Sequence, residues 1–237
     1  MAGETLTFGV SGKLIMNALV MYDHQTDTLW SQFLSRGVRG PLAGTSLEIV
    51  PVLQTTWGQW LGLHPDTLVL DKRGNNWGDS YERYYKNGSA GIIGESNKDN
   101  RLPTKELVVG LNLEGNSIAY PFRDIAKQPV INDFFAGQDV LVTFELESET
   151  GVVFNRQVDG RTLNFRPVSQ DTGSFTGYTP VLMQDDETGT IWQALTGVAI
   201  EGELEGNVLT RLPSNYSFWF AWSDFYPDTE LYDNRAG

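Results

Sequence analysis

One of the two histidines in this 237-residue chain stands two positions before a carboxylate. In the segment His-Pro-Asp-Thr, His64 and Asp66 could act as a general acid and base, because both side chains can exchange protons with a substrate. A related segment, Tyr-Pro-Asp-Thr, keeps Asp228 but has Tyr226 in place of the histidine. A Pro-Asp-Thr motif without its histidine is typical of a turn in which Asp accepts hydrogen bonds from nearby backbone N–H groups. Both interpretations stay open at this point.

Oxygen-bearing side chains recur in the polar segment that follows. Asp71, Asn75 and Asp79 have carboxylate and amide oxygens near the spacing of a calcium-binding loop. The final Glu and the flanking helices of an EF-hand are missing, and an ordinary Asn/Gly turn accounts for the same residues. Calcium is therefore the one cofactor that the sequence suggests, and the sequence requires none.

Three other residues are candidates for contact with a ligand. Trp77 lies in the same polar segment and has no counterpart elsewhere, so we expect an exposed indole that can stack on a ligand. Tyr22 and Gln32 are further candidate ligand-binding residues. The partner in this hypothesis is an unidentified small molecule or protein.

Composition excludes several classes of protein. A net charge of −13 repels a phosphate backbone, so we expect no nucleic-acid partner. The absence of cysteine excludes disulfides and thiol catalysis. No apolar run approaches the roughly 18 residues that span a bilayer, and the first residues do not resemble a signal peptide.

The chain contains an internal repeat. At an offset of 162 positions, Met21–Asp71 matches Met183–Asp233 without a gap and with 16 identities in 51 positions. Ordinary residue frequencies would give roughly three identities. Gly-Glu-Thr-Leu-Thr-Phe from residue 3 also matches Gly-Arg-Thr-Leu-Asn-Phe from residue 160. The shared tryptophans are expected in the core, and they are Trp30 and Trp192, Trp57 and Trp219, and Trp60 and Trp222.

Each repeat is expected to contain several strands and one short helix. Residues 18–32 read as two strands joined by a polar turn. Residues 40–52 read as a turn and a strand, and residues 66–71 as a further strand. Thr55 or Thr56 is expected to cap the helix, which ends before Pro65. Ser217 is the expected cap in the second repeat.

These patterns predict a mainly β protein with a minor α component, internally duplicated and with a few short helices. The expected parts are a first β repeat at 1–71, a polar connecting loop at 72–101, a β module at 102–159 and a second β repeat at 160–237. We expect them to form one compact, pseudo-symmetric unit.

The β module precedes only the second repeat. If each repeat pairs with such a module, the first strand of the first repeat has an uncovered edge. We therefore expect that the natural full-length protein carries an earlier module of this kind.

Several of these motifs together resemble a known family. The segments Leu-Thr-Phe-Gly-Val-Ser-Gly, Gly-Pro-Leu-Ala-Gly, His-Pro-Asp-Thr and Arg-Leu-Pro-Thr-Lys-Glu-Leu-Val-Val-Gly are similar to the bacterial and archaeal family named domain of unknown function 3179 (DUF3179). The resemblance implies an extracytoplasmic location for the full-length protein. It supplies no mechanism, because the family is uncharacterised.

The resemblance also indicates where this chain differs from its family. Members typically have an N-terminal module with a histidine before Val-Asn-Asp and then a Cys-Pro-x-Cys-Gly motif. The chain lacks that module, and its own module has Gln128, Glu145 and Ser148 where the histidine and the two cysteines would fall. Thiol or metal chemistry at that motif is therefore not expected in this chain.

Two classes of function remain. The first is a non-catalytic binding or interaction domain, favoured because the residues that recur in both repeats behave like structural ones. The second is a hydrolase or metal-assisted enzyme whose site includes His64 and Asp66 and is completed by a missing N-terminal module.

Overall fold

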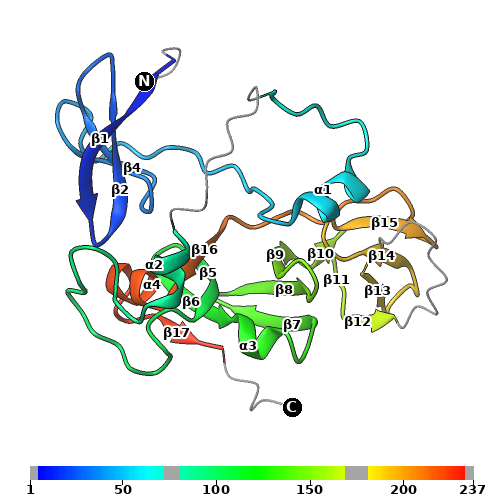
Figure 1. Cartoon of the computed structure of the whole chain (residues 1–237). Helices are drawn as coiled ribbons and strands as arrows, with labels where there is room; N and C mark the ends of the chain where they lie inside the picture. The colour runs from blue at the N-terminus through cyan, green and yellow to red at the C-terminus, as the bar shows by residue number, and fades with distance from the viewer. Residues whose placement is uncertain (1–4, 72–80, 169–180, 233–237) are drawn as a thin grey trace. The chain divides into compact units, whose positions relative to one another are not determined.

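A computed structural model of the chain describes residues 5–71, 81–168 and 181–232. The candidates Asn75, Trp77 and Asp79 lie outside these described residues. The protein is mainly β with a few short helices, as predicted (Figure 1). Its residues form two compact units. The first unit comprises Met1–Val50, Arg83–Lys105 and Phe218–Pro227, and the second comprises Pro51–Glu82, Glu106–Ser217 and Asp228–Gly237.

A four-stranded antiparallel sheet dominates the first unit. Its strands are β1 (Phe8–Ile15), β2 (Ala18–Asp23), β3 (Leu29–Ser31) and β4 (Arg36–Arg39), in that order across the sheet. The predicted polar turn joins β2 to β3, and its Asp27 has a positive φ of 55°. Strand β1 lies at an edge of the sheet.

The first unit also contains helix α4 (Trp219–Phe225) and all but the first residue of helix α2 (Glu82–Lys86). Helix α4 buries Trp219 and Trp222, in agreement with the expected core position of these tryptophans. The Trp219 Nε1–H donates to the Asp99 carbonyl at 3.0 Å. The predicted cap Ser217 was wrong, because Ser217 lies inside strand β16 and Phe218 occupies the cap position instead.

The second unit contains three larger sheets and a two-stranded ribbon. Strands β7 (Val130–Phe135), β8 (Gln138–Glu145) and β9 (Thr150–Asn155) form one antiparallel sheet, which we call the middle sheet. A second sheet has the order β16 (Ser214–Phe218), β5 (Leu107–Leu113), β6 (Asn116–Pro121), β17 (Glu230–Leu231). A third has the order β12 (Phe165–Val168), β13 (Leu182–Asp185), β14 (Ile191–Gln193), β15 (Val198–Glu201). Strands β10 (Gln157–Val158) and β11 (Arg161–Thr162) form the ribbon, and helix α3 (Phe122–Ile125) follows β6.

The middle sheet is apolar on both faces because its side chains alternate between two hydrophobic clusters. Val130, Leu141 and Phe154 belong to the cluster that contains the residues of β12–β15. Ile131 and Val142 belong to the cluster that contains the residues of β5 and β6. The middle sheet is therefore the central layer of the second unit.

Helix α1 (Trp57–Leu63) confirms the predicted start and end of the first-repeat helix. The Thr56 Oγ1 accepts a hydrogen bond from the Gln59 N–H, and His64 is the C-cap. The expected core position of Trp57 was wrong, because 51% of Trp57 is exposed and α1 has no buried residue.

Two strands predicted for the first repeat do not form. The second half of residues 40–52 and residues 66–71 carry no strand, and 95% of Leu68 is exposed. In the second repeat the counterparts of residues 68–69 form the two-residue strand β17 (Glu230–Leu231), because they pair with β6 in parallel. A strand needs a neighbour to accept its hydrogen bonds, and within the described parts of the chain residues 66–71 pair with no strand.

Candidate functional site

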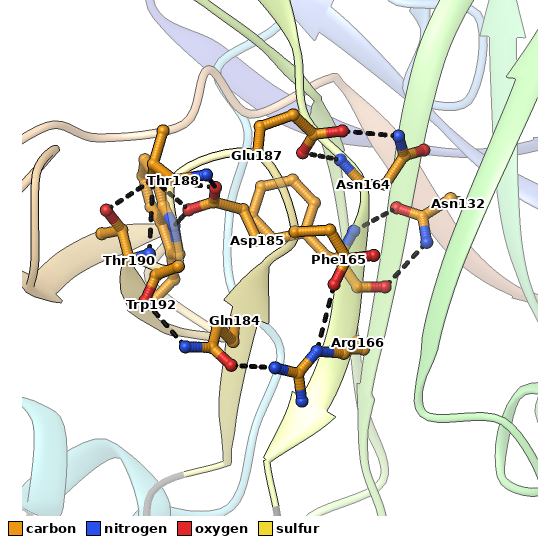
Figure 2. Close-up of polar contacts among 12 residues, drawn as sticks. Asn132, Asn164, Phe165, Arg166, Gln184, Asp185, Glu187, Thr188, Thr190 and Trp192 are labelled. Carbon is orange, nitrogen blue, oxygen red and sulfur yellow. Dashed lines mark hydrogen bonds and ion pairs between the residues drawn. The ribbon is translucent and has the colours of Figure 1, made fainter.

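A buried carboxylate organises the β13–β14 turn of the second repeat (Figure 2). Asp185 accepts hydrogen bonds from the Thr188 N–H at 2.6 Å and from the Thr188 hydroxyl at 2.8 Å. The Trp192 Nε1–H donates to the other carboxylate oxygen at 2.9 Å. Asp185 and Trp192 are fully buried, so this network joins the turn to the core.

The β2–β3 turn of the first repeat has the same network. Asp23 accepts from the Thr26 N–H at 2.5 Å, from the Thr26 hydroxyl at 2.9 Å and from the Trp30 Nε1–H at 2.8 Å. Burial raises the pKa of the Asp23 carboxyl, but the hydrogen bonds from Trp30 and Thr26 outweigh it and leave the pKa below its usual value. Because these bonds occupy both carboxylate oxygens, Asp23 has a structural role.

A glycine packs against each turn in the same way. Gly40 and Gly202 have φ values of +117° and +119°, which favour glycine. A Cβ on either residue would lie 2.8 Å from the Cα of Thr28 or Thr190, respectively. The two sheets therefore match in detail around these turns.

The two sheets differ in what lies on their apolar faces. We call Leu163, Phe165, Met183, Trp192, Leu204 and Leu209 the second-sheet face, and all six side chains are buried. Val130, Leu141, Val152 and Phe154 of the middle sheet belong to the same hydrophobic cluster. The second-sheet face is thus covered by the middle sheet.

The counterpart on the first sheet is only partly covered: Trp30 and Leu42 are buried, Leu6, Met21 and Leu47 are half-buried, and Phe8 is exposed. We call Leu6, Phe8, Met21, Trp30, Leu42 and Leu47 the first-sheet face, and each residue is identical to its counterpart in the second repeat. Phe8 is 39% exposed, whereas Phe165 is 3% exposed. A cavity of about 470 Å³ lies against this face, lined by Leu6, Phe8, Trp30, Leu42, Thr45, Ser46, Leu47 and Glu48.

The packing beneath the cavity is preserved. The rings of Phe8 and Trp30 meet edge to face, with centroids 5.8 Å apart and an interplanar angle of 85°. Phe165 and Trp192 have the same centroid separation and an angle of 82°. The aromatic pair at the centre of the first-sheet face therefore has the same arrangement as its counterpart.

An asparagine connects the middle sheet to the second repeat (Figure 2). The Asn132 amide donates to the Phe165 carbonyl at 2.7 Å and accepts from the Phe165 N–H at 2.8 Å. Among the described residues, no side chain makes the corresponding pair of hydrogen bonds to Phe8. Within the described residues, the main chain of Phe8 thus lacks the side-chain partner that Phe165 has.

His64 and Asp66 lie in a shallow depression after helix α1, lined also by Trp60 and Thr67. The His64 ring packs on the Trp60 ring with centroids 4.3 Å apart, as Tyr226 packs on Trp222 at 4.5 Å. Within the described residues no hydrogen bond or ion pair joins His64 to Asp66. This geometry favours the turn interpretation, and the catalytic role of the pair stays a prediction.

The other candidate residues are not brought together. Tyr22 lies on β2, where strand alternation places it on the face opposite Met21, and its ring contacts His24 at 4.9 Å. Gln32 is exposed just after β3. Asp71 is the only described member of the proposed calcium group. The described residues contain no group of three or more His, Cys, Asp or Glu that could hold a metal ion.

Glu145 and Ser148 form a hydrogen-bonded turn between β8 and β9. The Glu145 carboxylate accepts from the Glu147 N–H at 2.9 Å, from the Ser148 N–H at 2.6 Å and from the Ser148 hydroxyl. The Ser148 hydroxyl also contacts the Thr150 hydroxyl at 2.6 Å. A polar turn therefore occupies the positions where the resemblance would place two cysteines.

The fold and this surface define a mainly β protein with two matching four-stranded sheets, one with a buried apolar face and one with a partly exposed apolar face. The family described as "Protein of unknown function (DUF3179)" matches residues 1–229, and the chain belongs to that family. No curated protein and no solved structure matches the chain. No helix in the described part of the chain is long and apolar enough to cross a membrane.

Sequence reasoning did not identify the first-sheet face. The available signal was the identity of all six apolar residues in the two repeats, which predicts two equivalent faces. The position of the β module, which directly precedes the second repeat and not the first, was the signal for which face is covered.

We predict that truncating the two equivalent phenylalanines has unequal effects. Phe165→Ala should lower the free energy of unfolding by about 3–5 kcal/mol, because it leaves a cavity under the middle sheet. Phe8→Ala should cost about 1 kcal/mol, because Phe8 already faces open space. Urea unfolding of both variants, followed by tryptophan fluorescence, measures the difference. Equal losses would show that the two faces are equally covered.

We also predict that acid destabilises the first sheet through Asp23. Its folded-state pKa is lowered, so its contribution is present above the unfolded-state pKa of about 3.9 and is lost as the pH falls through the folded-state value. Asp23→Asn should lower stability at pH 7 and make it less dependent on pH below about 4. Urea midpoints between pH 7 and pH 2.5 test this. An unchanged pH dependence in the variant would refute it.

Proposed function

We propose that the chain is a non-catalytic binding or interaction domain of an extracytoplasmic prokaryotic protein. Its binding surface is the first-sheet face together with the outer edge of β1. The prokaryotic and extracytoplasmic assignment rests on the family resemblance. The internal duplication is part of the proposal, because it explains two sheets with the same turn network.

The observation that carries the proposal is the cavity over the first-sheet face. An apolar patch rimmed by polar residues is typical of an interaction site, and Thr45, Ser46 and Glu48 provide such a rim here. The six counterparts of these residues in the second repeat are all buried in one hydrophobic cluster. The sheet is thus built to bury this face, and a partner would complete it.

The contacts of the recurring polar residues also favour binding over catalysis. Asp23 and Asp185 use both of their carboxylate oxygens within their own turns. Glu145 is likewise saturated by the backbone and hydroxyl of its turn. Side chains held in this way stabilise a shape and have no carboxylate oxygen free for a substrate.

We predict that the neutral apolar dye Nile red binds the first-sheet face. Phe8→Glu should weaken dye binding by about fivefold or more, because a charge at the cavity disfavours an apolar ligand by about 1 kcal/mol or more. Fluorescence titration of the full chain measures the affinity, and circular dichroism verifies that the variant is folded.

Phe134→Glu is the matched control. Phe134 is also an exposed phenylalanine, but it lies on β7 in the other unit. Dye binding should be unchanged in this variant. If Phe8→Glu and Phe134→Glu bind the dye equally well, the first-sheet face is not the binding surface and the proposed function fails.

A further inference from the structure

We infer that the partner of the first-sheet face is a β module built like the middle sheet of this chain. It is a three-stranded antiparallel sheet with one apolar face and an asparagine that hydrogen-bonds to the main chain of Phe8. This inference rests on the proposed function, since it names the partner of the same surface.

The second repeat shows what covers such a face. Its six apolar residues pack with Val130 of β7, Leu141 of β8 and residues of β9. The first-sheet face has the same six side chains and the same edge-to-face ring pair at its centre. A surface with the same side chains in the same arrangement accepts a cover of the same shape.

The main chain of β1 has the hydrogen-bonding groups that this cover needs. Phe165 pairs with Asp185 across β12 and β13, and Phe8 pairs with Asp23 across β1 and β2 in the same register. In an antiparallel pair of this kind, residues alternate between those that bond across the ladder and those whose N–H and C=O point outward. The outward N–H and C=O of Phe165 bond to the Asn132 side chain. The equivalent N–H and C=O of Phe8 are therefore placed to bond to an asparagine of the partner.

A second copy of this chain is not the expected partner. In every copy the relevant face of the middle sheet is already occupied by the second-sheet face of the same chain. Self-association through this surface would require that contact to open. The partner is therefore a separate β module whose apolar face is free.

A fusion protein tests this inference. A second copy of residues 102–159 is placed directly before Gly3, which reproduces the natural junction between Asp159 and Gly160. Hydrogen exchange of the Phe8 amide, measured by NMR, is compared with that in the unfused chain. We expect exchange to slow by at least about tenfold in the fusion, to near the rate of the Phe165 amide.

Asn132→Ala in the added copy alone is the matched variant. It should restore most of the fast exchange at Phe8 while the exchange at Phe165 stays slow. Val142→Ile in the added copy shifts the NMR signals of that copy away from those of the original copy. The folding of the added copy can then be followed separately.

Three results would overturn the inference. The first is an added copy that folds without protecting Phe8. The second is an added copy that stays unfolded, since the original copy folds against an identical face. The third is self-association of the unfused chain that protects Phe8. If Nile red still binds in a Phe8-dependent manner in any of these cases, the proposed function stands and only the partner is wrong.

Discussion

A sheet of four short strands cannot by itself bury an apolar face, and this constraint governs the whole protein. In the second repeat the middle sheet provides the cover, so that Trp192 and its neighbours join the largest described cluster of buried residues. In the first repeat an equivalent set of residues stands beside a cavity of about 470 Å³. The proposed function follows from this difference in the burial of the apolar face between two sheets that are otherwise alike.

Local hydrogen bonding explains why the two sheets agree so closely. The carboxylates of Asp23 and Asp185 each bind a threonine and a tryptophan within the next seven residues. Such short-range contacts form without help from the rest of the chain, so each turn is the same whether its sheet is covered or open. The residues that recur most clearly are thus those that fix the turns and the packing beneath them.

The accuracy of the sequence predictions follows the same division between local and distant contacts. The β2–β3 turn, the Thr56 cap and the end of α1 at His64 were predictable, because neighbouring residues determine them. The strand expected at residues 66–71 and the core position of Trp57 were not, because both require a covering partner. The position of the β module indicated an uncovered edge in the first repeat, but the first-sheet face was missed because its six apolar residues come from separate strands and loops that only the fold brings together.

The central claim is that the two sheets share their internal structure and differ only in their cover. Hydrogen exchange in the unmodified chain tests it most directly, with Phe8 and Phe165 amides compared in one sample. The account predicts that the Phe165 amide exchanges at least about tenfold more slowly, while the indole N–H groups of Trp30 and Trp192, both bound to aspartate, are protected alike. Equal protection of the two amides would contradict it.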